Sequence, residues 1–253
     1  MGIGYIIGCL LSLIFWKIDR QKVFIKLNHG LNNLIKNKII VQVFYILFII
    51  IVCFFIEQLK TKELYNLITA LLVIDISNTE KNNLKQREKV RFYDSISTIS
   101  RAVVCGFIAP LIYVLFLGNV FGVIYMLIYN ISMADENFEA FGLIFTVLTI
   151  LPSLVAQVFL YFIYLCRNKR SAIDFKGDYL LNFLLRPLLN VDILGAYVES
   201  VNFYYLYSTK KTDYLKSYGE YTKKIDEICI KDYLSIAYGI CLIVFVLFFI
   251  LLK

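Results

Sequence analysis

The stretch GFIAPLIYVLFLGNVFGVIY, residues 106–125, is apolar enough to cross a membrane, yet it contains its own helix breakers. About 20 apolar residues suffice for a helical span. Pro110, Gly118 and Gly122 interrupt this one, and a Gly-Asn pair stands near its middle. Proline removes a backbone donor, which a membrane bundle tolerates where neighbouring helices or waters bind the freed carbonyls. We therefore expect a bend and close helix contacts inside a bundle of membrane helices.

The chain as a whole has the composition of a membrane protein. Its 253 residues are 60% hydrophobic, with a mean hydropathy of +0.72, whereas soluble domains are about 45–50% apolar. The net charge is +7, but the basic residues lie in the loops between apolar runs, as is typical of membrane proteins. We predict one all-α, polytopic membrane domain over residues 1–253, with membrane lipid as a partner and without nucleic-acid binding.

Seven apolar segments are candidate membrane spans. They cover residues 2–16, 39–56, 64–76, 102–117, 120–134, 140–165 and 233–252. The first lacks a basic leader and a cleavage site, so we interpret it as a retained span. Segment 64–76 is only thirteen residues long, and it is either a short crossing or a helix packed at the interface. The number of crossings stays open at about five to seven.

The sign of charge in the loops predicts their side of the membrane. Segments 17–38, 77–101 and 166–232 are rich in lysine and arginine, and so we expect them to face the cytoplasm. Segment 135–139, DENFE, has three acids and no base, so we expect it on the opposite side.

Two loop segments have the spacing of amphipathic helices. In segment 17–38 the apolar residues share one face: Phe24, Leu27, Leu31, Leu34 and Ile35. Such a helix either lies on an anionic membrane surface or packs on the bundle. A second set recurs at spacings of 4, 3, 4 and 3: Tyr214, Tyr218, Tyr221, Ile225 and Ile228. This spacing predicts a helix leading into the last span, with tyrosines that pack or anchor at the interface.

Small residues at a spacing of four occur twice, as Gly4 with Gly8 and as Gly118 with Gly122. This spacing lets helix backbones approach closely in lipid. We interpret both pairs as packing sites within the chain, and homodimer formation is the alternative.

The sequence contains no motif for a catalytic, cofactor or metal site. GxSxG and phosphate-loop motifs are missing, the six cysteines form no CxxC pair, and His29 is the single histidine. Paired carboxylates do occur among lysines: Asp174 with Asp178, and Asp226 and Glu227 with Asp232. Mixed charge of this density is typical of a solvated helix face.

Residues 106–133 resemble a stretch of the CobD/CbiB membrane family, the adenosylcobinamide-phosphate synthases. The matching residues are Gly106, Ala109, Pro110, Leu111, Gly118, Tyr125 and Met133. Pro152 and Leu154 lie in a helix similar to the family's next one, and Asp19-Arg20 is similar to the pair after its first helix. The resemblance implies that Gly106, Ala109, Pro110, Gly118, Gly122 and Pro152 belong to a structural scaffold.

The polar residues of that family are largely missing from this chain. Segment 97–105 has no carboxylate or amide, and Ser132, Phe145 and Thr149 stand where the family has polar or acidic groups. In this the chain is similar to the AmpE-type subgroup. That resemblance implies a non-enzymatic inner-membrane regulator linked to β-lactamase induction or cell-wall sensing, with another envelope or signalling protein as partner. A synthase with relocated site residues is one alternative, and a small transporter, which the charge-poor spans disfavour, is another.

A cluster of basic residues marks the expected functional surface of such a regulator. It comprises Arg101, Arg167, Lys169 and Arg170. These side chains are expected to contact an anionic ligand or lipid headgroups, the latter at about 1 kcal/mol per charge.

Overall fold

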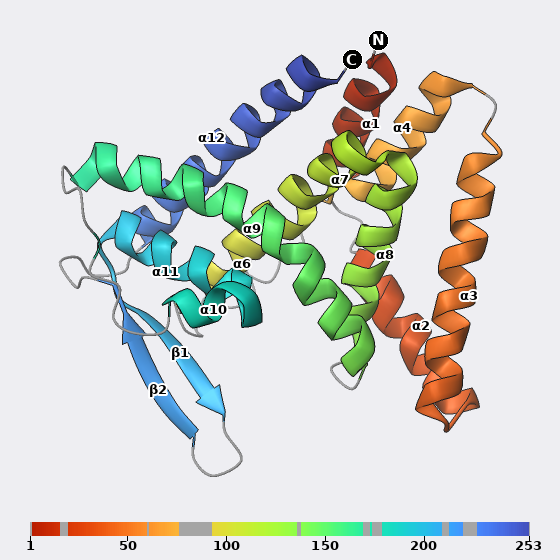
Figure 1. The fold of residues 1–253 in the computed structure, drawn as a ribbon, viewed down its shortest axis with the longest axis horizontal. Coiled ribbons are helices and arrows are strands. Elements are labelled where there is room, and N and C mark those ends of the chain that lie inside the picture. Colours follow the sequence, from red (N-terminus) through yellow and green to blue (C-terminus); the bar gives the residue numbers. More distant parts are fainter. Residues whose placement is uncertain are drawn as a thin grey trace.

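The computed structural model describes residues 2–15, 20–59, 61–75, 93–135, 138–168, 173, 179–208, 213–219 and 227–252. Within these ranges the chain is almost entirely helical (Figure 1), which confirms the all-α class. The helices are α1 (Ile3–Ile14), α2 (Arg20–Leu34), α3 (Lys38–Glu57), α4 (Lys62–Val73), α6 (Tyr93–Val103), the π-helix η1 (Val104–Ile108), α7 (Ala109–Leu117), α8 (Asn119–Ala134), α9 (Glu139–Asn168), α10 (Tyr179–Leu185), α11 (Pro187–Glu199) and α12 (Glu227–Leu251). Two strands, β1 (Phe203–Ser208) and β2 (Asp213–Tyr218), complete the structure.

Four helical segments are long and apolar enough to span a membrane. They are α3, the continuous run Ile96–Leu117 through α6, η1 and α7, the 30-residue α9, and Ile228–Leu251 of α12. These correspond to the predicted spans 39–56, 102–117, 140–165 and 233–252. The helices Ile3–Ser12 and Asn119–Ala134 are apolar but shorter.

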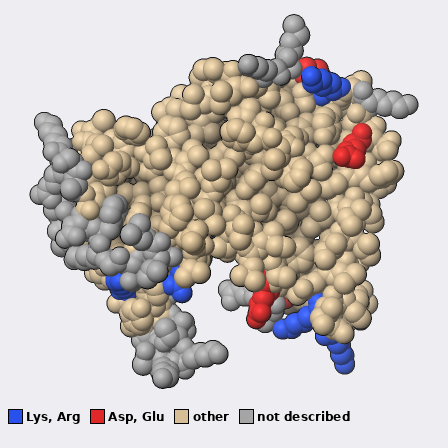
Figure 2. All heavy atoms as spheres, in the orientation of Figure 1, with Lys and Arg blue, Asp and Glu red and all other residues tan. Residues whose placement is uncertain are grey.

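The outer surface agrees with a membrane environment. Most of α3 exposes large apolar side chains, including Ile39 at 70% and Phe55 at 67%. Charged side chains on the face in Figure 2 lie near its upper right corner and along its lower edge, and the broad middle shows none. The many exposed apolar side chains require lipid or a partner to cover them.

The first glycine pair packs α1 against α4, inside one chain. A Cβ at Gly8 would lie 2.5 Å from the carbonyl oxygen of Leu67, and one at Gly4 would clash with the carbonyl of Glu63. The two helices lie side by side in Figure 1. The interpretation of Gly4 and Gly8 as an intramolecular packing site is therefore confirmed.

The π-helix and its neighbours explain Pro110. Proline has no N–H, so the carbonyl one turn earlier loses its helical donor. That carbonyl belongs to Gly106, and it accepts the Asp75 N–H at 2.9 Å. Gly106 has no side chain, and a Cβ there would clash with the Asp75 carbonyl. Gly106 and Pro110 together therefore form a docking point for the end of the α4 segment.

Pro152 follows the same rule inside α9. The carbonyl that it leaves without a helical donor belongs to Leu148. The hydroxyl of Tyr113 on α7 donates to this oxygen at 2.5 Å. Both prolines thus free a carbonyl for a donor from a neighbouring segment, as expected for broken helices in membranes.

Gly118 and Gly122 make the turn and the contact between α7 and α8. Gly118 has φ of +91°, in the region that favours glycine, and it separates the two helices. A Cβ at Gly122 would lie 2.6 Å from a methyl group of Val114. The apolar region 102–134 is therefore broken into two closely packed helices at the predicted place.

The helix predicted from Tyr214 onward is wrong at its start, because Tyr214 and Tyr218 lie in β2. Tyr221 and Ile225 lie outside the described residues, and Ile228 lies in α12. Strands β1 and β2 pair antiparallel from Phe203 with Tyr218 to Ser208 with Asp213. The Tyr207 and Tyr214 rings stack at 5.1 Å, and the hydroxyls of Tyr207 and Tyr218 are 2.7 Å apart. Aromatic cross-strand pairs stabilise hairpins, so the spacing of four also fitted a strand's period of two.

Helix α2 forms as predicted, and it packs on the bundle rather than only on a membrane surface. Its Asn28 is buried, and the amides of Asn28 and Asn32 donate to Asp135 at 3.3 and 3.5 Å. Leu34, predicted on the packed face, is instead 84% exposed. The contact with Asp135 also corrects the topology, because segments 17–38 and 135–139 meet and cannot lie on opposite sides of a membrane.

Candidate functional site

Helix α11 is unusual because it is buried almost all round and still carries two carboxylates. Every residue of Pro187–Glu199 except Leu188 is buried. It packs against α6, α9, α10 and α12. Asp192 is 5% exposed and Glu199 is 2% exposed. Acidic residues are almost never this buried unless they are paired, so the surroundings of each one are informative.

Glu199 has a complete set of partners. Arg167 on α9 donates to its Oε1 at 3.0 Å, and the thiol of Cys229 on α12 lies 3.4 Å from its Oε2. Arg167 also pairs with Asp232. Burial raises the pKa of Glu199, and the Arg167 charge opposes that shift. This cluster joins the ends of three helices, and two carboxylates account for the charge of Arg167.

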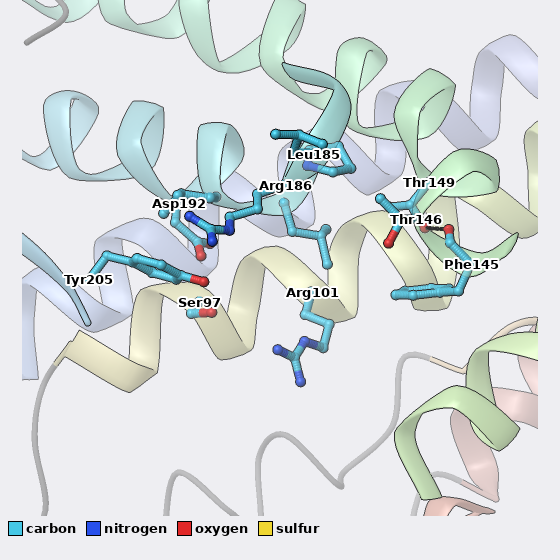
Figure 3. A pocket seen from close by; sticks show the side chains of 12 residues that line it. Ser97, Arg101, Phe145, Thr146, Thr149, Leu185, Arg186, Asp192 and Tyr205 are labelled. Atoms are coloured by element: carbon cyan, nitrogen blue, oxygen red, sulfur yellow. Dashed lines mark hydrogen bonds between the residues drawn. The ribbon is translucent and has the colours of Figure 1, made fainter. Parts of the chain in front are cut away.

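Asp192 faces a cavity instead. The cavity has a volume of about 230 Å³ and lies between α6, α9, the start of α11 and β1 (Figure 3). The polar residues that line it are Ser97, Arg101, Thr146, Thr149, Arg186, Asp192 and Tyr205. Its apolar wall includes Phe145 and Pro187.

The carboxylate of Asp192 is only partly satisfied. Hydrogen bonds from Ser100 and Ser97 stabilise its charge, but its Oδ1 has no hydrogen-bond partner within the described part of the chain. Burial raises the pKa of Asp192 from 3.8 to about 7, against the smaller opposing effects of the two hydroxyls and of Arg101. Near neutral pH this group is therefore poised between its neutral and charged forms.

Arg186 carries the second charge of the cavity and is exposed. Its guanidinium lies over the rings of Tyr207 and Tyr205, 4.8 and 5.6 Å from their centroids. Figure 3 shows the side chain directed toward Asp192. No ion pair joins Arg186 to Asp192 or to another described carboxylate. The aromatic rings thus orient a cation at the cavity.

The structure separates the basic residues that the sequence grouped. Arg101 lines the cavity, with its Nη1 3.6 Å from the sulfur of Met133, and its guanidinium points away from Asp192 in Figure 3. Arg167 belongs to the Glu199 cluster, outside the cavity lining. Lys169 and Arg170 lie outside the described residues, as do Asp19 and Asp174.

Positions that the family resemblance singled out do meet at this cavity. Phe145, Thr149 and Ser97 all line it. The hydroxyls of Thr146 and Thr149 donate to carbonyls of their own helix, Gly142 and Phe145, at 2.9 and 2.7 Å. The scaffold residues Gly106, Pro110, Gly118 and Gly122 lie elsewhere, in the contacts between helices described above. Phe145, Thr149 and Ser97 thus line the same cavity as Asp192 and Arg186, and the family resemblance itself stays a prediction.

Sequence reasoning missed Asp192 and Arg186. The signal for Asp192 was present, because PLLNVDILGAYV, residues 187–198, holds one carboxylate in an otherwise apolar run. This run lies inside segment 166–232, which the charge count placed in the cytoplasm, and so its single carboxylate was not considered as a buried one. Arg186 had no such signal, because its role depends on the hairpin that was not predicted.

No group of three metal-ligating side chains occurs among the residues that the structure describes. The comparisons with known proteins leave the site to be interpreted from its own geometry. No family model, no curated protein and no solved structure matches this chain.

Proposed function

We propose that this chain is a non-enzymatic regulatory protein of a bacterial inner membrane, of AmpE type, which acts by binding a small molecule in the Asp192 cavity. The observation that carries the proposal is the cavity itself, where a buried and partly unsatisfied carboxylate faces an oriented arginine. A concave site with a few convergent polar groups and one perturbed titratable residue is the usual form of a binding site.

Binding, rather than catalysis, fits the polar groups of the cavity. A catalytic hydroxyl needs a neighbouring base within hydrogen-bond reach. The hydroxyls of Thr146 and Thr149 are instead committed to carbonyls of α9. The two serines beside Asp192 serve its carboxylate. These groups hold and orient a ligand without supplying a nucleophile.

A hydrogen-bond chain offers a route from the cavity to a candidate span. Ser100, which bonds to Asp192, is also 2.9 Å from the hydroxyl of Tyr233 on α12. The Tyr233 ring packs directly on Gly195 of α11. A ligand that binds Asp192 would change the partners of Ser100, and so the position of α12 is the expected output of the regulator.

The test is a deletion of the gene, with β-lactamase activity measured with and without a β-lactam challenge. The proposal expects induction to change by about fivefold or more, the lower end of ordinary regulatory coupling. Complementation with the natural chain should restore it, and complementation with Asp192→Asn should not. Unchanged induction in the deletion strain would remove the proposed function.

One observation favours a second function, that of an adenosylcobinamide-phosphate synthase. Phe145, Thr149 and Ser97, which stand at positions of that family's polar groups, surround a cavity that still holds a carboxylate. Expression in a cobalamin-synthesis mutant lacking that step is the test. Growth without supplied cobinamide phosphate would favour the synthase, and failure to grow, with the protein present in the membrane, would reject it.

A further inference from the structure

Asp192 and Arg186 carry opposite charges at one cavity, which Arg101 also lines, and no described ion pair joins Asp192 to Arg186. Asp192 is 5% exposed, and its Oδ1 lacks a partner among the described residues. Arg186 lies on the same wall of the cavity and makes no described ion pair. A buried oxygen without a hydrogen-bond partner is costly. Glu199, on the same helix, shows that α11 can supply a complete ion pair where the role is structural.

We propose that the cavity binds a small zwitterion of the amino-acid class, with its carboxylate on Arg186 and its ammonium group on Asp192. The proposal rests on the binding function inferred above and names its ligand. A single molecule with both charges satisfies both side chains at once. An anion alone would leave Asp192 unsatisfied, and a cation alone would leave Arg186 without a counter-ion.

Arg186 is oriented so that it can bind a carboxylate. A guanidinium presents a planar fork of donors that matches the two oxygens of a carboxylate. The Tyr205 and Tyr207 rings hold this fork at 5.6 and 4.8 Å from their centroids. Stacking on the two rings already restricts the orientations of the Arg186 side chain. Less conformational entropy is therefore lost when a ligand binds.

Asp192 has an oxygen that can accept a hydrogen bond from a ligand. Ser97 and Ser100 bond to Asp192 while its Oδ1 stays open. An ammonium group brings three donors and no acceptor, so it can bond to Oδ1 and still reach another oxygen at the cavity wall. A volume of about 230 Å³ lies below the ~300–1,000 Å³ of pockets that hold drug-sized ligands, which favours a molecule of few atoms.

The experiment is a thermal unfolding series on the full chain in detergent, with glycine, L-alanine and D-alanine as probes. Acetate and ethylamine, which each carry one of the two charges, are the matched controls. A ligand that binds only the folded state raises the midpoint in proportion to the logarithm of its concentration. At least one amino acid should raise the midpoint with this logarithmic dependence, and neither control should do so at the same concentration.

Three variants assign the effect to the cavity. Arg186→Gln should weaken binding by about tenfold or more, because it removes a charge-assisted contact. Asp192→Asn should weaken it similarly at pH 8. Lys26→Gln, an exposed lysine on α2 outside the cavity, should bind like the natural chain. Arg186 is exposed, so its variant tests the proposal even if the buried Asp192 variant fails to fold.

Several outcomes would overturn the proposal. Equal stabilisation by acetate and alanine would indicate a simple anion site, and stabilisation by ethylamine alone would indicate a cation site. Absence of a shift with all three amino acids, or a shift unchanged in both cavity variants, would reject the ligand class. If the deletion phenotype nevertheless persisted, the regulatory function would stand with a different ligand, so the two failures are distinguishable.

Discussion

Two carboxylates on one buried helix differ in almost every other respect. Asp192 and Glu199 are seven residues apart on α11, which places them on the same face two turns apart. Glu199 has an arginine, and through that arginine a second carboxylate, within one cluster. Asp192 has two serine hydroxyls and an open oxygen beside a cavity. The comparison separates a carboxylate that holds helices together from one that is kept open for a ligand.

Removing Arg167 should produce the largest loss of stability. Arg167→Met leaves Glu199 charged and buried without its partner, and breaking such a pair costs about 3–5 kcal/mol. The side chain of Arg167 is 29% exposed, so we expect the lower end of that range. Unfolding in mixed detergent micelles, followed by circular dichroism, measures the difference.

Arg186→Gln is the matched control for this experiment. It removes an arginine from the cavity that makes no described ion pair, so its free energy of unfolding should change by less than about 1 kcal/mol. Equal losses in the two variants would show that the clusters do not differ in role.

The second prediction concerns pH. Burial raises the pKa of Asp192 from 3.8 to about 7, so the folded state holds this proton between those values while the unfolded state releases it. Stability should therefore fall as pH rises from about 4 to 7 and then level off. In Asp192→Asn the free energy of unfolding should fall by about 1–4 kcal/mol less than in the natural chain between pH 4 and pH 7. A slope equal to that of the natural chain would place the responsible group elsewhere.

The sequence predicted the scaffold better than the site, for physical reasons. Apolar length and the breakers Gly118, Pro110 and Pro152 are local signals, because a proline or a positive φ has the same consequence in any neighbourhood. The break between α7 and α8 and the packing of Gly4 and Gly8 could therefore be expected. The partners of the freed carbonyls, Asp75 and Tyr113, could not, since they come from distant segments.

The cavity depends on contacts that no spacing reveals. Asp192 and Arg186 line one cavity because α11 packs against α6 and α9 and because the β1–β2 hairpin brings Tyr205 and Tyr207 over the arginine. The hairpin was missed because its tyrosines fit helical and strand periods equally well. The sequence placed segments 17–38 and 135–139 on opposite sides of the membrane because charge counts ignore direct contacts such as Asn28 with Asp135.

Gly106→Ala tests whether the close contact between Gly106 and the Asp75 carbonyl is as important for stability as the contacts of the Glu199 cluster. The added methyl group would clash with the Asp75 carbonyl, a backbone atom that cannot rotate away. Overpacking of this kind costs about 1–3 kcal/mol. Gly30→Ala on α2, where a methyl group meets nothing within 4 Å, is the control and should be neutral or slightly stabilising, because alanine is the better helix former. Equal stability of the two variants in micelle unfolding would mean that the docking of Asp75 is not rigid.

Tyr113→Phe should have the smallest effect of the series. It removes the hydroxyl that donates to the Leu148 carbonyl freed by Pro152, while the ring keeps its stacked contact with Tyr125 at 5.2 Å. Hydrogen bonds between membrane helices are worth about 0.6 kcal/mol on average and at most about 1.7. Because the lost donor leaves a half-buried carbonyl without that partner, we expect about 1 kcal/mol in the same unfolding assay. Tyr113→Phe in a Pro152→Ala background should cost nearly nothing, since the helix then supplies the donor itself. An equal loss in both backgrounds would show that the proline and the tyrosine are not coupled, and that the carbonyl is satisfied in another way.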